Sequence, residues 1–393
     1  MELNIDWPNR GHKYEKQDLN ELFDFLNDSK RTMSKSYYAK KFEENFSKFI
    51  GRKSLSTMSG AHSLDIASFL IESDNEDEII IPSHTYCASA LPFVRTKSKI
   101  KWADINPDCF TISFDSVKKL ISSRTKAIVI VHLYGLIATD IDKIISLAKE
   151  RNIIIIEDCA QALGAFKENI SVGNFGDISC FSFHSQKNLT TLGEGGMISV
   201  KDEKLLDKIE LYRHNGHCSF ENQSEYWLPA MTNVKYVSQN FIPFKSTLTE
   251  AQAIVGINVL KRILDLTKKR RKLFNYLTQK LSSLSELKFQ KFETELSHSH
   301  HLLPCRCISD KWNRNDLIKI LFEKFKIKCV IQYYPLHRYE LFKKFEYGFA
   351  EVPNTDEFYD SMISFPFSLT LNKIEIDYLV ESIIKSVKSL NDR

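Results

Sequence analysis

Short apolar runs alternate with segments of helical periodicity through the first two-thirds of the chain. The pattern predicts strands over residues 78–81, 99–104, 125–132, 152–157, 177–183 and 196–201, and helices over residues 63–72, 115–122 and 140–151. Strands that alternate with helices indicate an α/β fold with a mainly parallel sheet and helices on both faces. Ligands of such sheets bind at the carboxyl ends of the strands. Tyr86, Asp158 and the turn after Ser182 are expected at those ends.

The last third of the chain has a different pattern. Apolar positions at helical spacing predict one long helix over residues 247–283, with Thr249 as its N-cap. Beyond it we expect strands over residues 302–308 and 329–333 and helices over residues 315–325 and 373–390. The pattern therefore predicts a large ligand-binding domain over residues 1–250, and a linking helix with a small domain over residues 251–393.

Composition limits the function. The chain has 393 residues, 43% of them apolar, which is more than one core usually holds. A net charge of +4 fits an anionic ligand. Nucleic-acid binding needs a concentrated basic stripe, whereas the densest basic run, residues 268–272, is interpreted as the solvated face of a helix. No stretch approaches the length of a membrane span and no signal-peptide pattern is present, so we expect a cytoplasmic protein that binds neither nucleic acid nor membrane.

The cysteines and histidines form no evident metal site. Eight cysteines are scattered without a repeated CxxC pattern, as in a reduced protein. Alternation along a strand explains Cys305 and Cys307. His298, His300 and His301 stand among serines with no matching ligand set elsewhere, so they are interpreted as a solvated loop, with zinc as the alternative. We expect no metal.

The most informative residue is Lys187, which lies just before Gly193-Glu194-Gly195-Gly196. Upstream, the apolar run 153–156 leads into Asp158. An enzyme that uses pyridoxal 5'-phosphate needs a lysine amine, which forms a Schiff base with the cofactor aldehyde. It also needs a carboxylate that keeps the pyridine nitrogen protonated, so that the ring acts as an electron sink. A lone lysine would be expected on the surface, but together Lys187 and Asp158 are predicted to be the catalytic pair of such an enzyme.

Further motifs occur in a fixed order along the chain. They are Ser59-Gly60-Ala61, Pro82-Ser83-His84-Thr85-Tyr86, Val131-His132-Leu133-Tyr134-Gly135, Glu157-Asp158-Cys159-Ala160-Gln161, and Ser182-Phe183-His184-Ser185-Gln186-Lys187. From about Phe42 to the end, the chain resembles the DegT/DnrJ/EryC1/StrS sugar aminotransferases, which are fold-type I pyridoxal phosphate enzymes. Each motif alone is weak, but the set is specific. The resemblance implies the aspartate aminotransferase fold, with a seven-stranded, mainly parallel sheet and a smaller α+β C-terminal domain.

The resemblance also implies a role for each motif in binding the cofactor. Gly60 and Ala61 would open a helix whose free N–H groups and dipole bind the phosphate. Ser182 would donate a hydrogen bond to the same phosphate. Tyr86 would stack on the pyridine ring, and Gln161 would reach the ring hydroxyl. Taken singly, Gly60 and Ala61 are more simply the start of an ordinary helix, and Tyr86 is more simply a packed aromatic side chain.

By the same resemblance, the reaction is ping-pong transfer of an amino group from L-glutamate to a keto sugar. Lys187, once substrate has displaced it, would be the base that moves the proton between substrate and cofactor carbons. Burial and nearby positive charge would lower its pKa enough for that role. The usual acceptor in this family is a nucleotide-linked 3- or 4-keto sugar destined for surface polysaccharide or a glycosylated metabolite. Active sites shared between two subunits imply a homodimer.

The chain departs from the family pattern at several positions. Ala61 replaces a hydroxyl residue in the phosphate turn. Lys245 and Thr247 stand where the family has an asparagine and an arginine that cross the dimer interface. Lys245 would bind the cofactor phosphate of the neighbouring subunit as a point charge. The alternatives are that Lys245 is a surface lysine, or that Asn240 serves this role from a longer loop.

Two segments are candidates for the acceptor side of the site. Residues 218–236, which include Trp227, are longer than the family minimum and are expected to form part of the acceptor pocket. Tyr333-Tyr334-Pro335-Leu336-His337 is similar to a family stretch near the active site, which makes His337 a candidate contact.

Three alternatives remain open at the level of sequence. The acceptor could be a carbonyl without a nucleotide, such as a keto-sugar acid or a small phosphorylated ketone. A pyridoxamine-dependent dehydratase of the same fold would lack the Schiff-base lysine, so Lys187 argues against it. A non-catalytic cofactor-binding regulator is disfavoured by the complete pair of Asp158 and Lys187. The sequence does not identify the sugar, the carbon that is aminated, the stereochemistry or the nucleotide.

Overall fold

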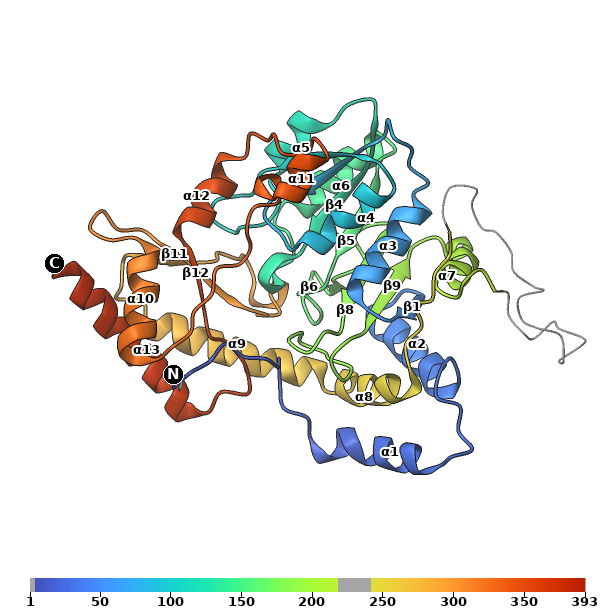
Figure 1. Cartoon of the computed structure of the whole chain (residues 1–393), viewed down its shortest axis with the longest axis horizontal. Coiled ribbons are helices and arrows are strands. Elements are labelled where there is room, and N and C mark those ends of the chain that lie inside the picture. Colours follow the sequence, from blue (N-terminus) through green and yellow to red (C-terminus); the bar gives the residue numbers. More distant parts are fainter. Residues whose placement is uncertain (1–3, 218–241, 393) are drawn as a thin grey trace, which may run out of the picture.

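The computed structural model describes residues 4–217 and 242–392, and its centre is a seven-stranded sheet (Figure 1). In spatial order the strands are β1 (Ser54–Thr57), β9 (Gly196–Val200), β8 (Ile178–Ser182), β5 (Ile154–Asp158), β4 (Thr125–Val131), β2 (Glu78–Pro82) and β3 (Lys99–Ala103). Within this sheet β9 alone runs against the others, because it pairs antiparallel with both β8 and β1. The predicted α/β fold with a mainly parallel sheet is confirmed.

Helices cover both faces of the sheet. One face is covered by α2 (Tyr37–Ile50), α5 (Phe114–Leu120), α6 (Ile141–Glu150) and α8 (Glu250–Leu260), and the other by α3 (Gly60–Leu70), α4 (Leu91–Arg95) and α7 (Leu206–Tyr212). Successive side chains of a strand point to opposite faces, so β5 directs Ile155 into one buried core and Ile156 into the other. Helix α1 (Lys16–Asn27) packs on α8. A two-stranded ribbon, β6 (Phe166–Lys167) and β7 (Ile170–Ser171), lies apart from the sheet.

The helix predicted over residues 247–283 is in fact two helices, α8 and α9 (Ile263–Lys280). Thr249 is confirmed as the N-cap, and its hydroxyl accepts a backbone N–H at 3.3 Å. The break falls at Arg262, whose backbone leaves the helical conformation at φ −116° and ψ 12°. The Arg262 guanidinium pairs with Asp18 of α1. The apolar periodicity runs through the break between the two helices, so the sequence pattern does not reveal it.

The C-terminal part has its own antiparallel sheet, ordered β10 (Leu287–Phe289), β11 (Leu303–Cys307) and β12 (Met362–Phe365). Its helices are α10 (Arg314–Phe325), α11 (Glu340–Lys344), α12 (Pro353–Ser361) and α13 (Lys373–Asn391). Cys305 and Cys307 enter the same buried cluster, as alternation along a strand predicts. The strand predicted over residues 329–333 is wrong. One bridge joins Val330 to Ser364, and the chain then turns away toward the large sheet.

The first described residues lie against this C-terminal part (Figure 1). Ile5 forms a parallel bridge with Ile327, and the Asn4 amide donates to the hydroxyl of Tyr378 in α13 at 3.1 Å. Farther along, the N–H of Gly11 donates to the carbonyl of Ser185 at 3.0 Å. The N-terminal segment thus connects the C-terminal part to the turn after β8. The division of the chain at residue 250 stays a prediction.

Arg270 corrects the interpretation of residues 268–272 as a solvated face. Its side chain is 2% exposed, because it stands in the buried stripe of α9. The guanidinium donates to three main-chain carbonyls, those of Gly11 at 3.0 Å, His300 at 3.3 Å and His301 at 3.4 Å. These hydrogen bonds compensate for the loss of water around a buried charge.

The histidines near residue 300 are also buried, so the prediction of a solvated loop is wrong. The rings of His298 and His300 stack at 4.2 Å, and both side chains are fully buried. The Nε2 atom of His298 bonds to the Oε1 atom of Gln290 at 3.1 Å, and burial lowers the pKa of His298 to about 3. This segment packs between Phe274 of α9 and the loop after β4, where Leu136 bridges to His298.

The seven cysteines within the described ranges carry free thiols. In the same ranges, none of the helices combines the length and the apolar composition that crossing a bilayer requires.

Candidate active site

A cavity of about 560 Å³ lies at the carboxyl ends of the parallel strands, as the alternating pattern predicts. Its wall brings together residues from β4, β5, β8 and α3, the segment after β2, and a segment from the C-terminal part. The predicted site residues that line it are Gly60, Ala61, Tyr86, Asp158, Gln161, Ser182 and Lys187.

Asp158 is the last residue of β5, and its carboxylate is held in a fixed position. Its Oδ2 atom accepts the hydroxyl of Ser89 at 2.7 Å, and its Oδ1 atom accepts the N–H of Ala160 at 3.0 Å. The side chain is 6% exposed. These two donors hold the carboxylate in place at the wall of the cavity. Ser89 was not identified from the sequence, because serines are common in loops and nothing marks this one.

Lys187 extends into the cavity from the turn after β8. Burial lowers the pKa of its amine to about 8, although the negative charges of Asp158 and Glu194 oppose this shift. The expectation that nearby positive charge helps to lower the pKa is not met, since the described neighbours that act on Lys187 are acidic. The amine is therefore uncharged to a large extent in mildly alkaline solution, as a nucleophile or base must be.

The start of α3 fits a phosphate group. Ser59 caps the helix and accepts the N–H of His62 at 3.2 Å, whereas the N–H groups of Gly60 and Ala61 have no acceptor within the described residues. A Cβ atom at Gly60 would lie 2.7 Å from the Cβ of Ser182, so glycine allows the helix to approach the end of β8. Free N–H groups, the helix dipole and the nearby Ser182 hydroxyl are features that suit an anion.

The opposite wall carries flat side chains suited to a ring. Tyr86 stands at the rim and is 58% exposed. Gln161 is fixed more deeply: its Oε1 atom accepts the N–H of Tyr134 at 2.6 Å, and its Nε2 atom donates to the hydroxyl of Tyr333 at 2.8 Å. Tyr333 and its neighbour Gln332 enter the cavity from the C-terminal part and were not predicted. The sequence signal for them was the position of Tyr333 in the stretch that ends at His337.

Comparison with known proteins decides the family. The sequence matches the DegT/DnrJ/EryC1/StrS aminotransferase family over residues 13–384. The chain belongs to this family. It is therefore an aminotransferase that uses pyridoxal 5'-phosphate, and the residues that line the cavity fit that cofactor, with an anion site, a flat wall, a lysine amine and a carboxylate.

Known relatives and a solved structure match this chain over nearly its whole length. GDP-perosamine synthase of Escherichia coli O157:H7 is 28% identical over 370 residues, which are 94% of each chain. The spore coat polysaccharide biosynthesis protein SpsC of Bacillus subtilis is 27% identical over 361 residues, 91% of each chain. PseC of Helicobacter pylori, an aminotransferase of pseudoaminic acid biosynthesis, has a TM-score of 0.88 and 24% identity over 98% of this chain and 100% of its own. The likeness to this structure confirms the predicted fold.

Several predicted site residues of the aminotransferase lie away from its cavity. Lys245 is exposed and does not line the cavity; its backbone bridges to His214. His337 bonds through Nδ1 to the Ser83 hydroxyl at 2.7 Å and likewise lies outside the lining. Asn240 and residues 218–236, with Trp227, fall outside the described residues, so their predicted roles stay predictions.

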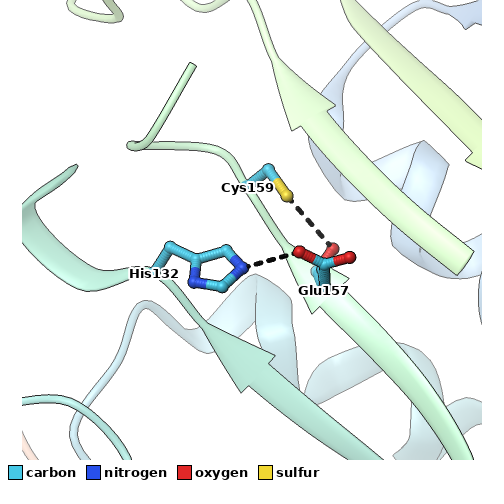
Figure 2. A group of neighbouring side chains, drawn as sticks. All are labelled: His132, Glu157 and Cys159. Carbon is cyan, nitrogen blue, oxygen red and sulfur yellow. Dashed lines mark hydrogen bonds and ion pairs between the residues drawn. The ribbon is translucent and has the colours of Figure 1, made fainter. Parts of the chain in front are cut away.

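A buried group beside the active site resembles a metal site but is already satisfied by hydrogen bonds. Figure 2 shows His132, Glu157 and Cys159, with the His132 Nε2 atom 2.9 Å from a carboxylate oxygen of Glu157. The Nδ1 atom of His132 accepts the N–H of Ala138, so Nε2 carries the hydrogen and donates it. Burial raises the pKa of the Cys159 thiol well above its usual value, which disfavours a thiolate ligand.

The carboxylate of Glu157 also accepts three main-chain N–H groups, from Gly173 at 3.0 Å, Phe175 at 2.9 Å and Gly176 at 2.6 Å. These donors occupy both of its oxygens. Glu157 therefore ties the end of β5 to the loop that leads into β8. Because Glu157 precedes Asp158 and side chains alternate along a strand, this attachment sets the position of Asp158 in the cavity.

Proposed function

We propose that this aminotransferase moves the amino group of L-glutamate to the keto group of a nucleotide-linked sugar. The observation that carries the proposal is the Lys187 amine and the Asp158 carboxylate in one cavity with the anion site of α3. Relatives named GDP-perosamine synthase and dTDP-3-amino-3,6-dideoxy-alpha-D-galactopyranose transaminase, the latter 28% identical over 349 residues, support the acceptor class.

The residues of the chain divide the work. When bound, pyridoxal phosphate supplies the electron sink that allows a proton to leave the carbon bearing the amino group. Asp158, with its two fixed donors, would hold a proton on the ring nitrogen. Lys187, with its lowered pKa, would take and return the proton at the substrate carbon. Gly60, Ala61 and Ser182 would hold the phosphate.

The rim of the cavity supports a large acceptor. The volume of about 560 Å³ is in the range of pockets for small ligands. Met58 and Tyr86 line its mouth and are 43% and 58% exposed. A sugar would occupy the cavity, while its nucleotide would extend past these side chains. A keto-sugar acid or a small phosphorylated ketone would leave the rim unused, and this is the main competing acceptor class.

The donor half-reaction provides a direct test. We expect that L-glutamate added to the cofactor-loaded protein will convert the visible band of the cofactor into the near-ultraviolet band of its amino form, with 2-oxoglutarate released in equal amount. Adding GDP- or dTDP-linked keto sugars should then restore the visible band. D-glutamate is the matched control. If L-glutamate does not change the spectrum, it is not the donor. If the visible band returns only with ketones that carry no nucleotide, the competing acceptor class is correct.

The cavity is poor in positive charge, which supports a homodimer with shared sites. Of the described residues that line it, Lys187 alone is a lysine or arginine, whereas the cofactor phosphate and the donor carboxylates are anions. Lys245 lies beside Lys35, and burial and the charge of Lys35 lower the pKa of Lys245. Lys35 is already paired with Glu210, whereas the side chain of Lys245 is exposed and suits an anion that belongs to a second subunit.

Lys245→Ala is therefore expected to weaken cofactor binding by about tenfold or more, as the loss of one charged hydrogen bond implies. Fluorescence titration of the cofactor-free protein with pyridoxal phosphate measures this change. The exposed Lys268 provides the control, since Lys268→Ala should bind as the wild type does. Sedimentation that shows a monomer with full cofactor affinity would contradict the shared site.

A further inference from the structure

The Tyr333 hydroxyl carries a hydrogen whose direction follows from its neighbours. A main-chain N–H can only donate, so the hydrogen bond from Tyr134 identifies the Gln161 atom that it meets as the carbonyl oxygen. The Nε2 atom of Gln161 must then face Tyr333 and donate to its hydroxyl oxygen. Among the described residues, Gln161 is the one hydrogen-bond partner of this hydroxyl. The hydrogen of Tyr333 is therefore left for another acceptor.

The ring that presents this hydroxyl is held by other aromatic side chains. It stacks on Tyr134 with centroids 6.4 Å apart and planes 15° apart, and it meets the edge of Tyr86 at 6.0 Å. Tyr134 is fixed in turn, because its hydroxyl donates to the carbonyl of Gln332 and lies 2.7 Å from the Nε2 atom of His84. Tyr333 therefore has little freedom to turn its hydroxyl away from the cavity.

A ligand in the cavity can supply the acceptor for this hydrogen. Asp158 is the nearby carboxylate, but Tyr333 makes no hydrogen bond to it, and in the proposed function its remaining acceptor capacity serves the ring nitrogen of the cofactor. Burial raises the pKa of Tyr333, so its hydroxyl stays protonated and acts as a donor at any working pH. A donor beside the Gln161 amide suits an oxygen with negative charge.

We propose that Tyr333 donates a hydrogen bond to the ring oxygen of bound pyridoxal phosphate, beside Gln161. This inference rests on the proposed function, in which Asp158 meets the ring nitrogen and Gln161 the ring oxygen. The expected effect is electronic. A donor at the ring oxygen stabilises negative charge there. When the Lys187 nitrogen is attached to the cofactor, a negative ring oxygen favours a proton on that nitrogen. A hydrogen bond from Tyr333 to the ring oxygen weakens this attraction and lowers the pKa of the nitrogen. Tyr333 thus tunes the proton affinity of the Lys187 nitrogen.

Tyr333→Phe tests this assignment without removing the ring. In the variant, the negative ring oxygen loses the Tyr333 donor and therefore attracts a proton on the Lys187 nitrogen more strongly than in the wild type. The pKa of that nitrogen, read from the visible absorption of the cofactor-loaded protein between pH 5 and pH 10, is expected to rise by about one unit, a tenfold change in proton affinity. Tyr334→Phe is the matched control, because Tyr334 packs on Tyr339 and Tyr359 outside the cavity. The control should titrate as the wild type does.

An unchanged titration in Tyr333→Phe would overturn the proposal. If that variant titrates normally but has a raised KM for the keto acceptor, Tyr333 serves the substrate instead, and the proposal also fails. Failure of the proposed function would look different, because L-glutamate would then leave the wild-type spectrum unchanged, whatever the titration of Tyr333→Phe shows. Circular dichroism and the cofactor Kd, which Phe in place of Tyr should leave close to wild type, show that the variant is folded and loaded.

Discussion

Lys187→Ala is expected to reduce turnover by more than about 10³-fold while the protein stays folded. General acid–base catalysis alone contributes about 10²–10⁴-fold, and this substitution removes the cofactor-attached amine together with the proton-transferring base. The side chain points into a cavity rather than into a packed core, so its loss leaves no buried group without a partner. The cofactor should still bind through the anion site at the start of α3, but without a covalent bond to the protein.

Steady-state assays with the donor and acceptor found in the spectral test measure the loss. Borohydride reduction followed by mass spectrometry should attach the cofactor to the peptide that contains Lys187 in the wild type, and to no peptide in the variant. Lys268→Ala, which changes an exposed lysine of α9, should match the wild type in both assays. Turnover of Lys187→Ala within tenfold of the wild-type rate would refute the catalytic assignment.

The second large effect concerns stability. Glu157→Gln is expected to lower the free energy of unfolding by about 2–6 kcal/mol, out of the 5–15 kcal/mol typical of proteins. One carboxylate oxygen accepts His132 and Gly173, and the other accepts Phe175 and Gly176. The glutamine NH₂ group cannot accept, so either orientation leaves two buried donors unpaired, at about 1–3 kcal/mol each. Urea unfolding measures the change.

The pH dependence separates this carboxylate from a simple packing effect. Burial alone would raise the pKa of Glu157, but hydrogen bonds from His132, Gly176 and Gly173 outweigh it and hold the pKa below its usual value. The carboxylate therefore contributes its full stability above the unfolded pKa of about 4.3 and loses it as the pH falls through the lower folded pKa. The difference between wild type and variant should be constant at neutral pH and shrink in acid.

Glu44→Gln on the exposed side of α2 is the matched control and should change stability by less than about 0.5 kcal/mol. A difference between wild type and Glu157→Gln that does not depend on pH would show that the negative charge of Glu157 is not what stabilises the fold.

The sequence predicts the large sheet well, because its strands are buried and continuous apolar runs identify them. It also places Asp158 and Lys187 in one cavity, since both follow parallel strands that end at the same edge. What it misses depends on partners that are distant along the chain. Arg262, at the break between α8 and α9, pairs with Asp18 of α1. Ser89 is fixed by a carboxylate 69 residues away. Periodicity carries no information about such pairs.

Polar residues in buried positions are the other source of error. Arg270 lies in the same stripe of α9 as Phe274, so helical spacing already marked it as inward-facing, but its charge suggested solvent. His298 and His300 were misjudged for the same reason, because a run of serines and histidines has the composition of a loop. In each case the hydrogen bonds that make burial possible come from main-chain groups or from distant residues.

The N-terminal segment has a consequence for the order of events during synthesis. Gly11 contacts the turn of Lys187, but it is also held by Arg270 and by the hydroxyl of Ser368, and Ile5 needs Ile327. While the chain is on the ribosome, the large sheet can form as soon as β9 has emerged. The segment that contacts the lysine turn gains these further anchors only when Arg270, then Ile327 and then Ser368 have been translated. Nascent chains halted before Arg270 should therefore have a formed sheet and an exposed lysine turn, which pulse proteolysis of stalled ribosome complexes would detect.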